Sequence, residues 1–127
     1  MTGLVDFRTL VPPNRPSRWL IAPPGVTAVA PDAPAPSFAI SADALADRLA
    51  MVLAALPRAA LVARTGRRMA FVQKSRVFQF VDDIAAEAID LGDGMSAPTL
   101  YSVSRVGYSD FGVNRTRLES VLAALAL

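Results

Sequence analysis

The sequence predicts an α+β domain: an antiparallel sheet of about four strands backed by two helices, with a proline-rich N-terminal arm. Three observations support this prediction. Eight of the ten prolines lie between Pro12 and Pro36, segments near 41–57 and 114–127 repeat apolar residues with a helical period, and short alternating segments lie between them. We therefore divide the chain into an extended arm, residues 1–36, and an α+β domain, residues 37–127.

The arm is predicted to be extended or polyproline II with turns, because proline fixes φ and removes a backbone donor. A disordered tail would not expose as many apolar side chains as this arm contains. These are Leu4, Val5, Phe7, Leu10, Trp19, Leu20 and Ile21. The arm is therefore expected to pack on its own domain or on a partner, and the sequence leaves both open.

The first helix is predicted in "SADALADRLAMVLAALP". Ser41 is a preferred N-cap residue, Asp43 lies in the first turn where the helix dipole favours a carboxylate, and Pro57 ends the helix. Its apolar residues form one stripe, which is expected to cover a sheet: Leu45, Leu49, Val52, Leu53 and Leu56.

The sheet is predicted from short runs that follow. "AALVAR" and "RMAFVQK" flank the turn "TGR", "RVFQFV" continues the alternation, and "DIAAEAIDL" turns at "GDG". The last strand is "TLYSVSRV". Its period of two places Leu100, Ser102 and Ser104 on one face, and Tyr101, Val103 and Arg105 on the other.

A junction, "GYSDFGVNR", leads into the final helix, which is predicted to start at about Asn114. Asn114 is a preferred N-cap type, and Val113 has the spacing of a hydrophobic staple to Leu118. Gly107 and Gly112 supply backbone freedom, while Tyr108 and Phe111 are expected to plug the end of the sheet. The alternative is an anion site at the helix N-terminus, formed by Arg115 and Arg117 near Ser109.

Composition limits the chemistry. The chain has no cysteine and no histidine, which excludes Cys/His zinc sites, thiol nucleophiles, Ser-His-Asp triads and His-ligated haem. We expect no cofactor and no enzymatic activity. Asp82, Asp83 and Asp110 could serve as paired carboxylates, but pairing with Arg76 and Arg105 is the favoured interpretation. A hydrolase would need the three aspartates to converge in a cleft.

Thirteen basic residues stand against eleven acidic ones, a formal charge of +2. The basic run "RTGRRMAFVQKSR" could contact phosphates, but the near-neutral total and the acidic run "DDIAAEAIDLGDG" beside it argue against nucleic acid. A solvated hairpin or an acidic protein partner is favoured, and anionic lipid headgroups are a third option. No apolar run reaches bilayer length and no signal-peptide h-region is present. The expected location is therefore the cytoplasm, including the cytoplasmic face of the inner membrane.

The motifs "SRVFQFVDDI" and "SVSRVGYSDFGVNRTRLESVLAAL" resemble a widespread bacterial family catalogued as domain-of-unknown-function family fourteen-ninety-nine. The resemblance covers residues 37–127 and is strongest over 104–115. The matching residues there include Arg105, Tyr108, Asp110 and Asn114. The resemblance implies a shared fold, and it brings no known activity.

We therefore expect a non-catalytic accessory subunit that docks onto a larger, membrane-bound bacterial complex, of which a respiratory complex is one example. The expected partner-binding residues are Phe7, Trp19, Leu20, Arg115 and Arg117. The alternative is a small-ligand or lipid-binding domain, with an apolar cavity guarded by Arg105 and Arg115.

Overall fold

A computed structural model describes residues 3–76, 79–107 and 110–126, and a mixed six-stranded sheet forms its centre. The strand order is β2-β1-β6-β5-β4-β3, with only β1 and β2 parallel. The strands are β1 (Arg18–Ala22), β2 (Ala33–Pro34), β3 (Ala59–Thr65), β4 (Arg68–Lys74), β5 (Val81–Gly92) and β6 (Met95–Ser104). The helices are α1 (Ala42–Ala54) and α2 (Val113–Leu125).

The α+β class and the two helices are confirmed, but the prediction of about four strands is wrong. The two additional strands come from the segment expected to be an extended arm. The run "RWLIA" contains no proline, and as β1 it pairs antiparallel with the end of β6, with Trp19 opposite Ser102. The two-residue strand β2 lies at the edge of the sheet. Pro34 has no backbone N–H to donate, and an edge strand tolerates this because it has a neighbouring strand on one side only.

Helix α1 begins as its sequence predicts. Ser41 is the N-cap, and its hydroxyl accepts a hydrogen bond from the backbone N–H of Ala44 at 3.1 Å. The buried side of the helix carries Ala42, Leu45, Ala46, Leu49 and Leu53. The apolar stripe therefore packs on the sheet, and Asp43 lies in the first turn on the solvent side.

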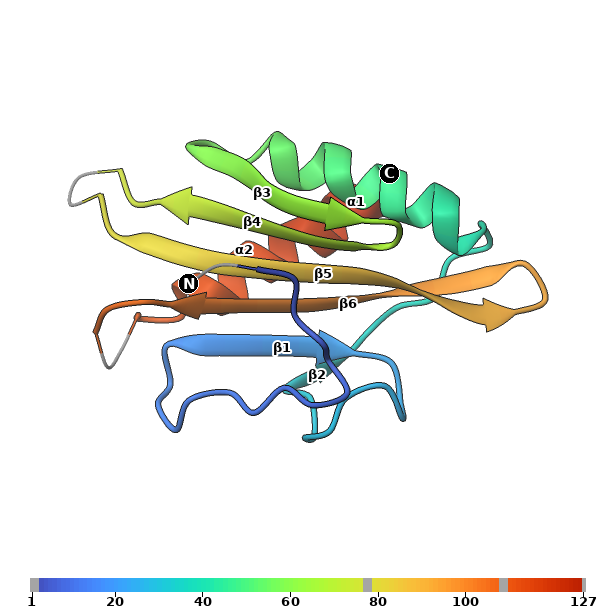
Figure 1. Ribbon diagram of the computed structural model, residues 1–127, viewed down its shortest axis with the longest axis horizontal. Coiled ribbons are helices and arrows are strands. Elements are labelled where there is room, and N and C mark those ends of the chain that lie inside the picture. The colour runs from blue at the N-terminus through green and yellow to red at the C-terminus, as the bar shows by residue number, and fades with distance from the viewer. Residues whose placement is uncertain (1–2, 77–78, 108–109, 127) are drawn as a thin grey trace.

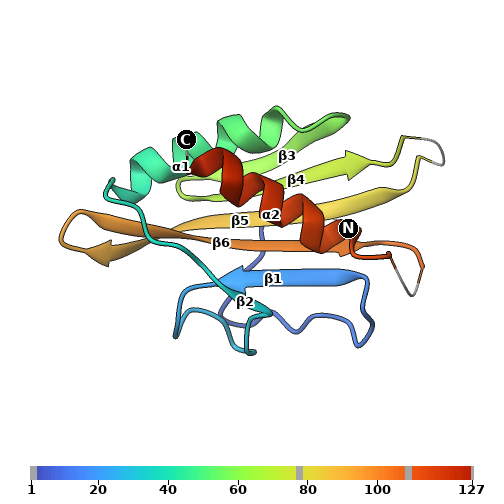
Figure 2. The ribbon, with the colours of Figure 1, turned by 180° about the vertical axis from the view of Figure 1, so that it is seen from behind.

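Both helices cover the same face of the sheet, and α2 crosses it obliquely (Figure 2). The main core lies between helices and sheet and includes Leu49, Phe71, Ile84, Leu100 and Leu118. On the last strand, Leu100 and Ser102 face the helices while Tyr101 faces away, as the alternation predicts.

The opposite face of the sheet is partly covered by the N-terminal segment, which crosses in front of the strands in Figure 1. Phe7 is fully buried there, in a small cluster with Leu20, Ala85 and Tyr101. Burial raises the pKa of Tyr101 to about 12. The segment therefore packs on its own domain, one of the two outcomes that the sequence left open.

The sheet has two unlike ends (Figure 1). One end, here called the loop end, holds the α1–β3, β4–β5 and β6–α2 connections. The other, the hairpin end, holds the β3–β4 and β5–β6 turns and the start of α1. Within the described ranges 3–76, 79–107 and 110–126, no helix is long and apolar enough to cross a membrane.

Candidate functional site

The start of α2 at the loop end is capped by Asp110 and not by Asn114. The carboxylate of Asp110 accepts hydrogen bonds from the backbone N–H groups of Gly112, at 2.9 Å, and Asn114, at 3.0 Å. The helix begins at Val113, with Gly112 at the N-cap position. Burial would raise the pKa of Asp110, but the hydrogen bonds from Asn114 and Gly112 outweigh it and leave that pKa below its usual value.

Asn114 is instead the centre of a buried polar network, and its prediction as N-cap is wrong. Its side-chain carbonyl accepts from the hydroxyl of Ser102 at 2.6 Å. Its amide nitrogen donates to the backbone carbonyl of Ser17 at 3.1 Å, to Ser104 Oγ at 2.9 Å and to Asp110 at 2.5 Å. The network therefore joins the start of α2 to β6 and to the residue before β1.

Arg117, one turn further along α2, extends this network. Its guanidinium donates to Asp82 at 2.6 Å, to Ser102 Oγ at 2.9 Å and to the side-chain carbonyl of Asn114 at 2.8 Å, and it also donates to Gln73. Only 10% of the Arg117 side chain is exposed. A buried ion pair persists when additional hydrogen bonds satisfy both partners, and these contacts supply them.

Gln73 links the network to the α1–β3 connection. Its side-chain oxygen accepts from Arg117, and its amide nitrogen donates to the backbone carbonyl of Pro57 at 3.0 Å. One side chain of β4 thus holds α2 and the α1–β3 connection at a fixed separation. Between them lies an open cleft of about 450 Å³, here called the β4–α2 cleft. It is lined by Leu56, Pro57, Arg58, Gln73, Lys74, Ser75, Asp82, Phe111, Val113, Thr116, Arg117 and Ser120.

Two cationic residues, Arg58 and Lys74, line the β4–α2 cleft and are joined through the backbone of Lys74. The backbone N–H of Lys74 donates to the carbonyl of Arg58 at 3.2 Å, and Arg58 Nε donates to the carbonyl of Lys74 at 3.0 Å. Arg58 holds this position with a φ of 58°, in the left-handed region that a non-glycine residue rarely adopts. Among the described residues, no carboxylate forms an ion pair with either side chain.

A second hollow of about 440 Å³ adjoins the cleft. Four exposed apolar side chains line it, and we call them the apolar tip: Phe80, Val106, Phe111 and Val113. Phe111 is 96% exposed and Val106 is 61% exposed. Phe111 has a φ of 54°, so the connection holds it in a left-handed conformation beside Gly112, and the expected plugging of the sheet end by Phe111 is wrong.

The three aspartates considered for acid/base chemistry do not all converge: Asp82 and Asp110 both line the hollow beside the cleft, but Asp83 does not. Asp82 faces α2 and pairs with Arg117, while its neighbour Asp83 faces the opposite side and forms two hydrogen bonds with Arg105, at 2.9 and 2.8 Å. The hydrogen bond with Asp83 raises the pKa of Arg105. Asp110 caps α2. Of the predicted pairings with Arg76 and Arg105, the structure shows that of Asp83 with Arg105, whereas Asp82 pairs with Arg117 and not with Arg76. The three carboxylates do not form the arrangement that a hydrolase would need.

The expected partner-binding residues fall into two groups. Phe7 and Leu20 are buried in the cluster under the N-terminal segment, and Arg117 is held by the polar network. Trp19 and Arg115 lie together at the β1 edge, with the Arg115 guanidinium 4.9 Å from the centre of the indole ring. Arg115 also pairs with Glu119 at 3.2 Å.

The cavity expected between Arg105 and Arg115 is not formed, because the two lie on opposite faces of the sheet. Arg105 pairs with Asp83 on the face of the N-terminal segment, whereas Arg115 contacts Trp19, which packs against the core under the helices. Tyr108 and Ser109 lie outside the described residues, so the structure does not test the role predicted for Tyr108 in the junction.

Sequence reasoning missed Arg58, Gln73 and Lys74 as a group. Arg58 and Lys74 are far apart in sequence and meet only because β3 pairs with β4. Within the described residues, no group of three potential metal-ligating side chains gathers.

Comparison with known families finds a match over most of the chain. The family model described as a protein of unknown function, DUF1499, matches residues 17–125. The match begins just before β1 and ends with α2, so it includes the whole sheet. No curated protein matches the chain.

Proposed function

The chain belongs to the DUF1499 family of proteins of unknown function, and we propose that it is a non-catalytic accessory module that docks onto a larger protein assembly through its loop end. The observation that supports this most is the apolar tip. Four large apolar side chains from two connections and the start of α2 are exposed around one hollow. Apolar side chains exposed singly are common, but a cluster of them marks an interaction site.

The charge around the apolar tip indicates the chemistry of the partner. Arg58, Lys74 and Arg76 surround this end and are exposed, while the nearby aspartates Asp82 and Asp110 are engaged in hydrogen bonds within the chain. An apolar centre with a basic rim suits a protein surface that has an apolar centre and an acidic rim. A bacterial membrane-bound complex, such as a respiratory complex, is the setting that we propose, with the chain at the cytoplasmic face.

This proposal moves the docking surface from the N-terminal arm to the loop end. Phe7 and Leu20 are buried within the chain, so a partner could reach them only if the segment detached. Trp19 and Arg115 remain partly accessible and lie on the far side of the α2 N-terminus. They form a second, smaller contact area in the proposal.

Site-specific photocrosslinking in the native host tests the proposal. A benzoylphenylalanine replaces Phe111 at the apolar tip, and in a matched variant it replaces Leu91, which is exposed at the hairpin end. We expect one identified protein to be captured from position 111 and not from position 91. Capture should fall when Val106→Ser is added. Equal capture from both positions, or none from position 111, would contradict docking through the loop end.

A further inference from the structure

We propose that the β4–α2 cleft is a binding site for a small amphipathic anion, a phosphate or carboxylate group carried on a short apolar body. This site goes beyond docking through the apolar tip: it shares Phe111 and Val113 with the tip, but it is a separate cleft whose floor and α1–β3 wall the tip does not include. The cleft has a preformed floor, and its lining combines two cations with apolar side chains.

The cations are the first argument. Two hydrogen bonds join Arg58, directly before β3, to the backbone of Lys74 in β4, and the Arg58 side chain donates one of them. Both side chains line the cleft, and two like charges at one site repel each other. Among the described residues no carboxylate pairs with them. An anion between them would offset this repulsion and accept hydrogen bonds from both side chains.

The floor of the cleft is the second argument. Asp82 is already paired with Arg117, so the floor carries no net charge, and Gln73 hydrogen-bonds to both walls. A site whose walls are tied together loses little conformational freedom when a ligand binds. The cleft is therefore preorganised, with two cations in its lining.

The lining is the third argument. Leu56, Pro57, Phe111 and Val113 form the apolar part, while Ser75, Thr116 and Ser120 contribute hydroxyl groups. A volume of about 450 Å³ lies within the range of small-molecule sites. A lining that combines apolar side chains with two cations matches a ligand with an apolar body and one anionic group. A fully polar anion would leave the apolar part empty.

Titration calorimetry with octyl phosphate below its micellar concentration tests the site. Inorganic phosphate and the uncharged octyl glucoside are the matched probes. Octyl phosphate should bind most tightly. The double variant Arg58→Gln/Lys74→Gln should raise its Kd by about tenfold or more, because two charge-assisted hydrogen bonds are lost.

The control variant makes the same change in charge at the hairpin end. Arg64→Gln/Arg67→Gln removes two arginines that pair with Asp47 and Asp43, and it should leave the Kd for octyl phosphate unchanged. Val106→Ser, outside the cleft, should also leave it unchanged, which separates this site from the apolar tip. Equal binding of octyl glucoside, or equal weakening by both arginine variants, would overturn the proposal.

A second variant covers the case in which the double variant does not fold. Thr116→Trp fills the cleft from the exposed side of α2 and keeps both cations, so it should abolish octyl phosphate binding in a folded chain. Unchanged binding would overturn the site. Vesicles of phosphatidylcholine with and without phosphatidic acid identify the source of the anion. If the chain sediments with the acidic vesicles and Arg58→Gln/Lys74→Gln abolishes this, the anion belongs to a lipid headgroup. If the chain binds octyl phosphate but not the vesicles, the anion belongs to a free molecule.

Discussion

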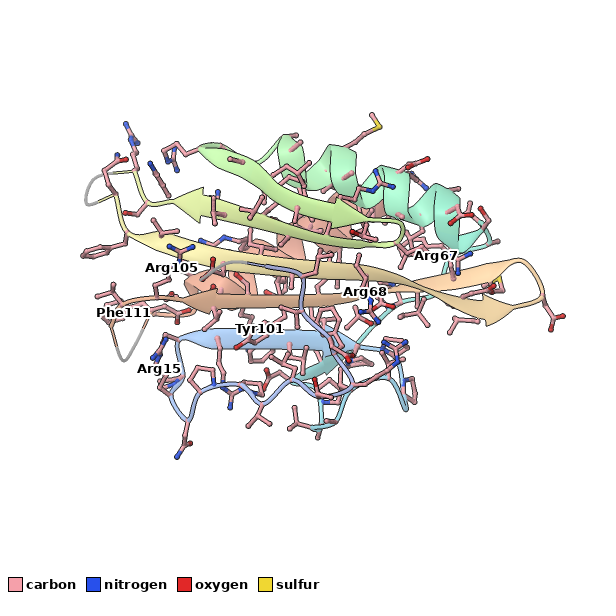
Figure 3. The ribbon with its side chains drawn as sticks, in the orientation of Figure 1. Arg15, Arg67, Arg68, Tyr101, Arg105 and Phe111 are labelled. Atoms are coloured by element: carbon pink, nitrogen blue, oxygen red, sulfur yellow. The ribbon has the colours of Figure 1, made fainter. Side chains whose placement is uncertain are left out.

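The two ends of the sheet use arginine in different ways. At the hairpin end, Arg64 and Arg67 pair with Asp47 and Asp43 of α1 at 2.7 and 2.8 Å, on the protein surface. The hydrogen bond from Arg67 holds the pKa of Asp43 below its usual value. At the loop end, Arg117 is buried in a network and Arg58 hydrogen-bonds to Lys74. Figure 3 shows the two ends of the sheet, with Arg67 at the hairpin end and Arg105 and Phe111 at the loop end.

The two ends differ in whether each arginine has a carboxylate partner nearby. At the hairpin end, arginine and carboxylate neutralise each other in solvent, and such pairs contribute little to stability. At the loop end, Arg117 is paired with Asp82 inside the fold, while no carboxylate among the described residues forms an ion pair with Arg58 or Lys74. We infer that the loop end is where charge is available for a ligand or a partner.

The largest effect should come from Arg117→Leu. The substitution leaves Asp82 buried without its cation and removes the donor to Gln73, and breaking a buried pair costs about 3–5 kcal/mol in the free energy of unfolding. Urea unfolding followed by circular dichroism measures this loss.

The double variant Asp82→Leu/Arg117→Leu is the control for that prediction. Because neither charge is then buried alone, it should be more stable than Arg117→Leu. If Arg117→Leu cost less than 1 kcal/mol, the network would be no stronger than a surface pair, and the contrast between the two ends would disappear.

The next largest effect should come from Asp110→Ala, which removes the cap of α2. Loss of a capping side chain costs about 1 kcal/mol, and the wild-type carboxylate accepts from two backbone N–H groups. Thermal unfolding at neutral pH measures the difference. Asp93→Asn, in the β5–β6 turn of the hairpin end, is the control for loss of one negative charge, because asparagine tolerates the left-handed φ of 55° at this position.

The effect of Asp110→Ala on the free energy of unfolding should depend on pH. The pKa of Asp110 is lowered in the folded chain, so its stabilising effect is present above the unfolded pKa of about 3.9 and is lost as the pH falls through the folded pKa. The gap in stability between wild type and Asp110→Ala should therefore be full at neutral pH and narrow below pH ~4. A gap that is constant down to acidic pH would show that Asp110 acts through packing and not through its charge.

Local sequence signals predicted the parts of this fold that depend on neighbouring residues. The apolar stripe and Ser41 located α1, and the alternation in "TLYSVSRV" gave the correct faces of β6. β1 was missed because its pairing with β6 spans most of the chain and prolines surround it. Long-range pairing leaves no periodic signal in a segment of five residues.

The polar network was missed for the same reason. Asn114 has the residue type and position of an N-cap, and its spacing supports that prediction. Its burial is possible because Ser102 and Ser104 of β6 and Ser17, directly before β1, supply three polar partners that sequence could not place together. Asp110 then takes the cap, four residues before Asn114. Residue types were therefore informative at this site, and the partners were decided by the tertiary structure.

Arg58→Gly should have a smaller effect of the opposite sign. A left-handed conformation costs a non-glycine residue about 1–2 kcal/mol, and glycine loses about 0.5–1 kcal/mol through its greater backbone freedom, so a gain of about 0.5 kcal/mol is expected. Urea unfolding measures the gain, and the same sample should bind octyl phosphate more weakly. A substitution that raises stability and weakens binding would show that Arg58 serves the cleft at the expense of the fold. Loss of stability would mean that the bond from Arg58 to Lys74 outweighs the strain.

The smallest effect should come from Arg64→Gln at the hairpin end. Its pair with Asp47 is short but largely exposed, and exposed pairs contribute about 0.3 kcal/mol once side-chain entropy and salt are included. Unfolding in low and high salt measures this contribution, which should vanish at high salt because screening removes it. The result fixes the scale for the loop end, because it gives the contribution of an arginine–carboxylate pair of similar length without burial. If Arg64→Gln lowered the free energy of unfolding as much as Arg117→Leu, burial would not be what distinguishes the arginine pairs at the two ends.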